Sequence, residues 1–493
     1  MNNIKNINTP FVLLVTFLSF ISIYSTKLYL ISLILAAIEY LIVYYFIVKG
    51  KVYQSFLTYV LFLSTTIERD DMVYYDGVIP FERYSIFNPG LLFRVTGILI
   101  FIQAYCQYKG LPFINKDIHR FKKWVYLLLT TGLLSMFITI VLDDHSIISK
   151  GRSFNAYFSV VMGFISLISL IFTALILCKE KKSKERLSNA LICILMGVSL
   201  STIISILLGY EGYYGTEYKT MLAPLLAGFC PCLLLFTRGR SIGESIILYA
   251  IVAFVMILAF KYPTPIGSKW YLVIGFSVVC LVYSYLPRKN IGVFILMLIF
   301  ALTAIPLISE SLSSLMATDD FNNWKFNQAM GALDILSAPS IEYWFLGLDE
   351  SARFRFDEPI NIAIEYINEP IYAFLGKGFS GTTLHYTKFC DWDVSSAFVS
   401  IEQQLGAYST MHETFAVVFL RHGLLGVVFF VDVLIMLSRK IKNSPFAVWA
   451  IIWFFFYWAY GNSFRLGAVA CVIALASETI VSSKSEIQSN GNN

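Results

Sequence analysis

Residues 28–48 read LYLISLILAAIEYLIVYYFIV, an apolar run that contains a single charged residue, Glu39. A helix of about 20 such residues is long enough to cross a hydrocarbon core of roughly 30 Å. Backbone N–H and C=O groups in lipid must bond within their own segment, which favours a helix. The residues do not alternate between apolar and polar, so a membrane β-barrel is disfavoured. The run therefore predicts a transmembrane helix.

Runs of the same kind recur along the chain, which is 57% hydrophobic and only 14% charged. A soluble protein of 493 residues would form two or three domains with far more charge. We expect an all-α polytopic membrane protein with about 14 transmembrane helices and a long, partly helical extracytoplasmic loop, a GT-C-like arrangement. The predicted spans are 10–24, 28–48, 52–67, 89–107, 124–142, 156–178, 188–208, 220–237, 243–260, 270–286, 291–308, 412–437, 445–460 and 465–482.

The positions of Lys and Arg predict the orientation. With a cytoplasmic N-terminus, the cytoplasmic segments hold 21 of these residues and the short outer loops hold 8, as the positive-inside rule requires. We therefore predict four parts: a transmembrane bundle of about 11 helices (1–308), an extracytoplasmic loop (309–411), three C-terminal transmembrane helices (412–482) and a polar cytoplasmic tail (483–493). Both termini are expected in the cytoplasm, and the protein in the bacterial cytoplasmic (inner) membrane. The net charge of +5 belongs mostly to these loops and does not indicate nucleic acid.

The long loop has 14 acidic and 5 basic residues, a balance of −9, and several Trp, Tyr and Phe residues. This is too aromatic for a disordered linker. Residues 358–368 predict a short helix that lies over the membrane surface, and Gly376-Lys377-Gly378 predicts a tight turn. We expect the loop to cap a site at the outer face.

Ionisable residues within apolar runs are costly and often functional. The arginines in or beside the spans on the outer side are Arg94, Arg421 and Arg465, and the loop adds Arg353 and Arg355. Guanidinium is planar, permanently charged and suited to bidentate contacts with phosphate. The alternative is that each arginine reaches the membrane interface or pairs with an acid. Glu39 and Asp432 are the acidic candidates.

A group of motifs surrounds the start of the span after the loop. His412 opens this span, and Gly423 and Gly426 follow it by 11 and 14 residues. Upstream lie Ser351-Ala352-Arg353-Phe354-Arg355, the predicted helix, Pro370 and then Gly376-Lys377-Gly378. This order resembles the O-antigen polymerase and O-antigen ligase superfamily, in which a histidine begins a span and a Gly-x-x-Gly turn follows.

The resemblance covers roughly residues 351–430, and two features depart from the family pattern. Glu413 stands where the family has Asn or Ser, so that residue's role is not carried over. The spacing between Pro370 and Gly376 is longer than in the family, which leaves open whether Arg353 or Arg355 is the family arginine; we slightly favour Arg355.

The resemblance implies metal-independent, inverting glycosyl transfer without a cofactor. The donor would be a glycan linked to undecaprenyl pyrophosphate. It implies His412, Arg355 and Arg353 as catalytic residues. Pyrophosphate or glycan would be bound by residues drawn from Arg421, Arg94, Arg465, Gly376 and Gly378. Imidazole titrates near neutral pH and can accept a proton from the acceptor hydroxyl, while arginines stabilise the charge of the leaving group.

We expect a polymerase of O-antigen or a related surface polysaccharide, with a chain-length regulator, a flippase and the lipid bilayer as partners. The length and the span count favour this over the ligase, which transfers the glycan to lipid A–core. A lipid-linked sugar flippase is less consistent with the long loop. A metal-dependent glycosyltransferase is the remaining alternative, since Glu68, Asp70 and Asp71 offer the oxygen ligands that Mg²⁺ prefers.

Overall fold

The computed structural model describes residues 7–25, 29–65, 91–109, 115–142, 154–208, 225–237, 240–261, 269–285, 297, 350–387, 389–392, 400–409, 411–441, 443–457 and 466–477. Within these ranges the chain is helical, and the only β-type pairing is an isolated antiparallel bridge between Thr383 and Tyr408. The N-terminal elements are α1 (Thr9–Ser25), α2 (Tyr29–Val48), α3 (Val52–Thr65), α4 (Leu91–Tyr108), α5 (Lys116–Leu142), α6 (Phe154–Leu177), α7 (Lys181–Leu207), the 3-10 helix η2 (Leu225–Phe236), α8 (Ile242–Lys261) and α9 (Lys269–Tyr285). The C-terminal elements are α13 (Glu350–Asn368), η4 (Pro370–Tyr372), η5 (Gly378–Ser380), α14 (Ser400–Leu405), α15 (Thr414–Lys440), α16 (Phe446–Tyr457) and α17 (Leu466–Leu475).

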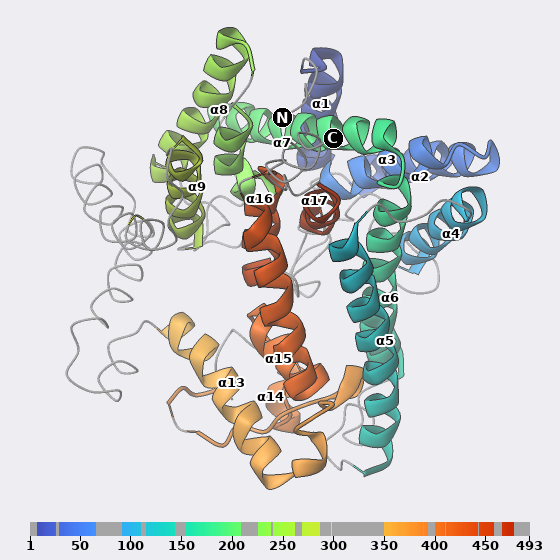
Figure 1. Cartoon of the computed structure of the whole chain (residues 1–493), viewed down its shortest axis with the longest axis vertical. Helices are drawn as coiled ribbons and strands as arrows, with labels where there is room; N and C mark the ends of the chain where they lie inside the picture. Colours follow the sequence, from blue (N-terminus) through green and yellow to red (C-terminus); the bar gives the residue numbers. More distant parts are fainter. Residues whose placement is uncertain are drawn as a thin grey trace, which may run out of the picture.

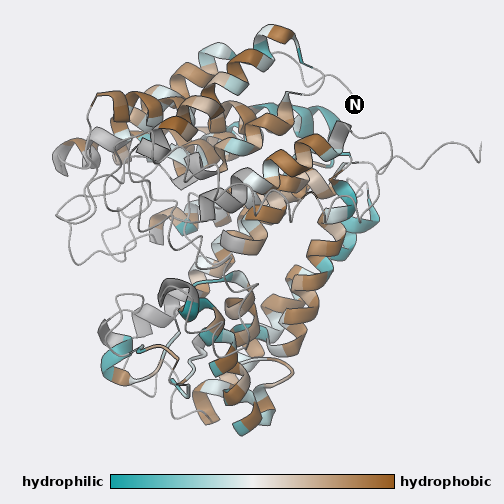
Figure 2. Cartoon of the chain, turned by 90° about the vertical axis from the view of Figure 1, so that its left-hand side faces the viewer, coloured by the Kyte–Doolittle hydropathy of each residue, from teal (hydrophilic) through white to brown (hydrophobic). Residues whose placement is uncertain are grey.

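The predicted apolar runs form helices throughout the described part of the chain. Three of these helices, α5, α7 and α15, are long and apolar enough to cross a membrane, and several shorter apolar helices accompany them. The predicted span 291–308 lies outside the described residues apart from position 297. Figure 2 shows hydrophobic residues along the helices, and hydrophilic residues at helix ends and in the 350–409 region. The helical, apolar architecture is consistent with a membrane protein.

Several hydroxyl side chains on these apolar helices bond within their own helix. Thr16 Oγ1 donates to the carbonyl of Val12 at 2.9 Å, and Ser199 Oγ donates to that of Leu195 at 2.7 Å. A hydroxyl that bonds to the carbonyl four residues earlier leaves no unpaired donor in an apolar environment. Thr16 and Ser199 therefore need no hydrogen-bond partner from another helix.

The antiparallel pair α5 and α15 forms the long axis of the molecule. Lys440 Nζ lies 2.9 Å from Asp117 Oδ2, which joins the end of α15 to the start of α5. Farther along, Arg120 Nη2 lies 2.6 Å from Asp432 Oδ1, and the Trp124 indole donates to Asp432 Oδ2 at 2.7 Å. In Figure 1, α5, α6 and α15 run lengthwise, whereas α2, α3 and α7 lie across one end of them. Because α2, α3 and α7 are not parallel to α5, α6 and α15, the described helices do not show fourteen parallel spans.

Helices α13 and α14 lie at the opposite end from α2, α3 and α7 (Figure 1). They have their own apolar core, which includes Phe354, Tyr366, Trp392 and Tyr408 and continues into Leu420 of α15. A second and larger core fills the bundle. We call the described residues of 350–411 the outer module, after the extracytoplasmic loop predicted for them. Because the smaller core includes residues of α15, module and helix form one packed unit.

Candidate functional site

Helix α13 turns a polar face inward. Asp357, Glu358, Asn361 and Glu365 are all fully buried, whereas Phe356 and Ile367 are exposed. The spacing of 357, 361 and 365 places three of these side chains on one stripe of the helix. Helix α13 is longer than the predicted helix 358–368, since it begins at Glu350 and contains both Arg353 and Arg355.

The buried polar stripe binds the extended segment 383–387. Asn361 Oδ1 accepts the backbone N–H groups of Tyr386 and Thr387 at 2.6 and 3.0 Å. Glu365 accepts the N–H of Leu384 at 3.2 Å, and the Trp392 indole donates to Asp357 at 2.9 Å. Buried backbone donors need partners, and here side chains of α13 supply them in place of a sheet. Burial raises the pKa of Asp357 above its ordinary value, although hydrogen bonds from Thr387 and Trp392 oppose the shift.

Two residue pairs join α13 to the segment that opens α15. His412 Nδ1 makes a short contact with Glu358 Oε1, and the backbone N–H of His412 donates to Glu358 Oε2 at 2.9 Å. Arg355 Nε lies 2.8 Å from Glu413 Oε1. Because residues 355 and 358 are one turn apart on α13, the two pairs hold the Arg355 guanidinium and the His412 imidazole in one neighbourhood.

This arrangement bears on which ring nitrogen of His412 can act as a base. When Nδ1–H is donated to a carboxylate, Nε2 is the basic nitrogen of a neutral imidazole. The His412 side chain is 18% exposed while that of Glu358 is fully buried. The carboxylate thus orients the ring from inside the module, and His412 is equipped to accept a proton from a hydroxyl group.

Helix α15 is broken at Gly423, where φ is 56° and ψ is −145°. The outer module supplies the hydrogen bonds that the break removes. The backbone N–H groups of Leu424 and Leu425 donate to the carbonyls of Ala373 and Phe374 at 2.9 and 3.1 Å. On the other side of the break, the Leu420 carbonyl accepts the N–H of Lys377 at 2.9 Å. Arg421 and the buried His422 lie at this break.

Three glycines make this close approach possible. A Cβ on Gly376, where φ is 73°, would lie 2.4 Å from the backbone N of His422. A Cβ on Gly423 would lie 2.6 Å from the Ala373 carbonyl oxygen, and one on Gly378 would lie 2.3 Å from the backbone N of Met136 in α5. Packing against α15 and α5 therefore accounts for the glycines in the predicted turn; their assignment to substrate binding stays a prediction.

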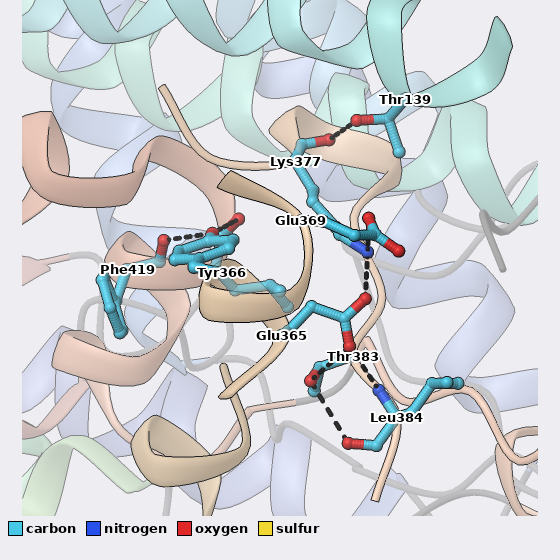
Figure 3. Close-up of polar contacts among 9 residues, drawn as sticks. Thr139, Glu365, Tyr366, Glu369, Lys377, Thr383, Leu384 and Phe419 are labelled. Atoms are coloured by element: carbon cyan, nitrogen blue, oxygen red, sulfur yellow. Dashed lines mark hydrogen bonds and ion pairs between the residues drawn. The ribbon is translucent and has the colours of Figure 1, made fainter. Parts of the chain in front are cut away.

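Lys377, between these glycines, forms a buried ion pair. Its side chain and that of Glu365 are both inaccessible to solvent and in direct contact, and Glu369 Oε2 lies 3.4 Å from Nζ. The backbone carbonyl of Lys377 accepts the Thr139 hydroxyl of α5 at 2.8 Å. Figure 3 shows this group together with Tyr366, whose hydroxyl donates to the Phe419 and Leu420 carbonyls of α15 at 2.8 Å each. The ion pair thus lies at the junction of α13, α5 and α15.

The structure brings some of the predicted arginines together and separates others. Arg353 shares α13 with Arg355, and its Nε is buried with no hydrogen-bond partner among the described residues. Arg421 is half-buried at the break. Arg94 lies on α4, which Figure 1 places on the far side of the bundle from α13. Arg465 lies outside the described residues, as do Glu68, Asp70 and Asp71.

Sequence reasoning missed several members of this region. Glu358 and Glu365 counted only toward the net charge of the loop, Lys377 only as the middle residue of the predicted turn, and Glu413 only as a departure from the family. A signal was present for Glu365, since the polar residues Asp357, Asn361 and Glu365 share a helical spacing. Asp432, in contrast, is explained by its structural partners Arg120 and Trp124.

No family model, no curated protein and no solved structure matches this chain. Its function is therefore argued from the residues and their geometry.

Proposed function

We propose that this protein is a membrane glycosyltransferase that polymerises lipid-linked oligosaccharide repeat units. The donor is a glycan linked through pyrophosphate to undecaprenol, and the acceptor is another lipid-linked unit. The observation that carries the proposal is the double link between α13 and the start of α15. Arg355–Glu413 and Glu358–His412 place a guanidinium beside a carboxylate-oriented imidazole.

Each residue has a distinct role in the proposed reaction. His412 Nε2 accepts the proton of the acceptor hydroxyl as its oxygen attacks the anomeric carbon. The bond from that carbon to the pyrophosphate oxygen breaks, and its electron pair leaves with undecaprenyl pyrophosphate. Arg355, with Arg353 or Arg421, stabilises the charge that develops on the leaving group. The reaction balances without a metal ion.

Glu413 gives this site a feature of its own. The carboxylate partly neutralises Arg355 when no donor is bound, and a pyrophosphate must compete with it for the guanidinium. The Arg355 and Glu413 side chains are 27% and 17% exposed, so solvent reaches the pair, and a doubly charged ligand that binds the guanidinium through two oxygens can displace the carboxylate. The exchange of Glu413 for pyrophosphate would keep the Arg355 charge paired.

The topology is part of the same proposal. The ends of α5, α7, α15 and α17 that charge counting assigns to the cytoplasm are linked to one another. The Asn115 amide donates to the Leu475 carbonyl at 2.8 Å, and Lys440 Nζ donates to the Ser477 carbonyl at 2.9 Å. Lys184 Nζ donates to the Ala476 carbonyl at 3.3 Å. These contacts support a cytoplasmic end opposite the outer module, in an inner-membrane protein with about 14 spans.

The test is glycan laddering on gels from cells that lack the protein and are complemented with variants. Wild type should restore the ladder, while His412→Ala and Arg355→Ala should not, and Glu358→Gln should weaken it. His119→Ala is the matched control, because His119 is exposed on α5 at the end distant from the outer module. Equal amounts of each variant in the membrane are verified by immunoblotting.

The gel pattern separates the competing functions. A single repeat unit on the core in cells without the protein establishes the polymerase. Loss of all attached glycan, with long polymer left on the lipid carrier, establishes the ligase instead. A ladder unchanged in the absence of the protein overturns both.

A further inference from the structure

The break in α15 lies within the thickness of a bilayer. The rise along α15 and the rise along α5 give this result independently. Leu424 precedes Lys440 by 16 residues, and at 1.5 Å per residue this is a rise of about 24 Å. Gly132, which packs against Phe379 and His422, follows Asp117 by 15 residues, a rise of about 22 Å. Lys440 and Asp117 pair with each other, so both lengths start from one level.

A hydrocarbon core is roughly 30 Å thick. Even if its inner boundary lay as far inward as the Lys440–Asp117 pair, both positions would fall inside the core. Any tilt of the helices shortens the rise and keeps them inside. The Gly376–Gly378 turn touches α15 and α5 at these positions, so it lies at membrane depth although it belongs to the outer module.

The backbone of this turn meets the condition for non-helical chain at that depth. Such backbone is tolerated only where protein or water satisfies its polar groups. The carbonyls of Ala373 and Phe374 accept N–H groups of α15, and Lys377 bonds through both its N–H and its carbonyl. The only charged side chain of the turn, that of Lys377, is paired with Glu365.

The outward side of the same segment is apolar. Ile371 and Phe374, which we call the hydrophobic ledge, are 61% and 63% exposed. On α15, the exposed residues Leu424, Val428 and Val431 follow one another at helical spacing and form one face of a span. Because Phe374 bonds to Leu425 through its carbonyl, the ledge continues this face toward the outer module.

We infer that residues 371–378 re-enter the outer leaflet, with the hydrophobic ledge in contact with the acyl chains of the bilayer. The outer module is thus anchored in the membrane and does not only lie over it. The lipid contact follows from membrane depth and from continuity with the apolar face of α15. It does not depend on the proposed glycosyl transfer, so either can fail alone.

The test is the accessibility of spin labels in nanodiscs of a single synthetic phosphatidylcholine. Labels are placed in a Cys106→Ser background, since Cys106 is the one exposed cysteine of the eight. The test positions are Ile371→Cys and Phe374→Cys. Val428→Cys serves as the lipid reference, and Lys182→Cys, an exposed cation, serves as the water reference. Collision rates with oxygen and with a water-soluble nickel chelate are measured by power saturation.

The ledge positions should resemble Val428→Cys, with high oxygen collision rates and several-fold lower chelate collision rates than Lys182→Cys. Chelate collisions equal to those of Lys182→Cys would overturn the inference, because the ledge would then lie in water. Low rates with both reagents would also overturn it, because another protein surface would then cover the ledge. A lipid-like signal that appears only after a polyprenyl phosphate is added would show that the occupant is the donor tail and not the bilayer.

Discussion

Lys377 and Glu365 form an ion pair that solvent does not reach, between the outer module and the helices α5 and α15. Removing one partner of a buried pair leaves the other charge uncompensated and costs roughly 3–5 kcal/mol. We therefore expect Lys377→Met to lower the thermal unfolding temperature in detergent strongly. The double variant Lys377→Met/Glu365→Gln should recover most of the loss.

The control for this pair is Glu369→Gln. Glu369 is also close to Lys377 Nζ, but its side chain is 36% exposed, so screening by water limits its contribution. A cost for Glu369→Gln as large as that for Lys377→Met would contradict the assignment of the buried pair to Glu365.

Gly376→Ala tests whether the turn must approach the break in α15 without a side chain. The added Cβ would meet the backbone of Arg421 and His422, so the change should cost at least about 3 kcal/mol and abolish the glycan ladder. Gly50 has a similar φ of 68° but nothing within 4 Å of its Cβ position. Gly50→Ala should therefore cost only the backbone strain, about 1–2 kcal/mol, and should keep the ladder. Similar unfolding temperatures for the two variants would argue against the close approach.

Tyr366→Phe removes the hydroxyl that donates to the Phe419 and Leu420 carbonyls, immediately before Arg421. Losing a buried hydrogen-bond donor costs about 1–3 kcal/mol. The ring remains edge-on against Phe419, so packing is preserved. We expect a modest fall in unfolding temperature and a shorter ladder, since the break would no longer hold Arg421 firmly. Tyr126→Phe, at an exposed position on α5, is the comparison and should leave the ladder at its wild-type length.

Asp357→Asn isolates the effect of burial on one carboxyl group. Because burial raises the pKa of Asp357 above 3.8, the folded state takes up this proton at a higher pH than the unfolded state. The contribution of Asp357 to stability therefore increases as the pH falls from neutral through the raised pKa, and levels off below 3.8. The measurement is the difference in unfolding temperature between wild type and Asp357→Asn over a pH series. We expect the unfolding temperature of wild type to rise relative to that of Asp357→Asn as the pH falls. A fall relative to the variant would show that the pKa is lowered instead.

The apolar runs and their length predicted that the chain is helical, because a run of about 20 apolar residues has few alternatives to a helix in lipid. The outer module was harder to predict, since its helix α13 buries polar residues and exposes Phe356 and Ile367. In the sequence, its acids look like those of a solvated surface. In the structure, Asp357 and Glu365 accept hydrogen bonds from the segment 383–387. The 3.6-residue periodicity alone does not show which face of such a helix is inside.

The site shows the same division. The order of the motifs drew attention to Arg355 and His412. In the structure Arg355 lies on α13, and His412 contacts Glu358, which is one turn farther along the same helix. The role of Glu413 as the partner of Arg355 was not predicted, because nothing in the spacing of the two residues brings them together. The break in α15 was also missed, since its apolar composition is that of a continuous span and the compensating hydrogen bonds come from residues about fifty positions earlier.

The broken helix has a consequence for how the protein is made. As α15 leaves the ribosome and enters the bilayer, it carries carbonyl and N–H groups around Gly423 that it cannot satisfy alone. Their partners, residues 366–377, precede it in the chain, and under the proposed topology they are exported before it arrives. Export of this segment must therefore finish before α15 can settle, and a delay there would leave an inserted span with open polar groups, a form that membrane quality control can recognise. Under the proposed topology, biogenesis thus has a fixed order, in which the outer module is in place before α15 is completed.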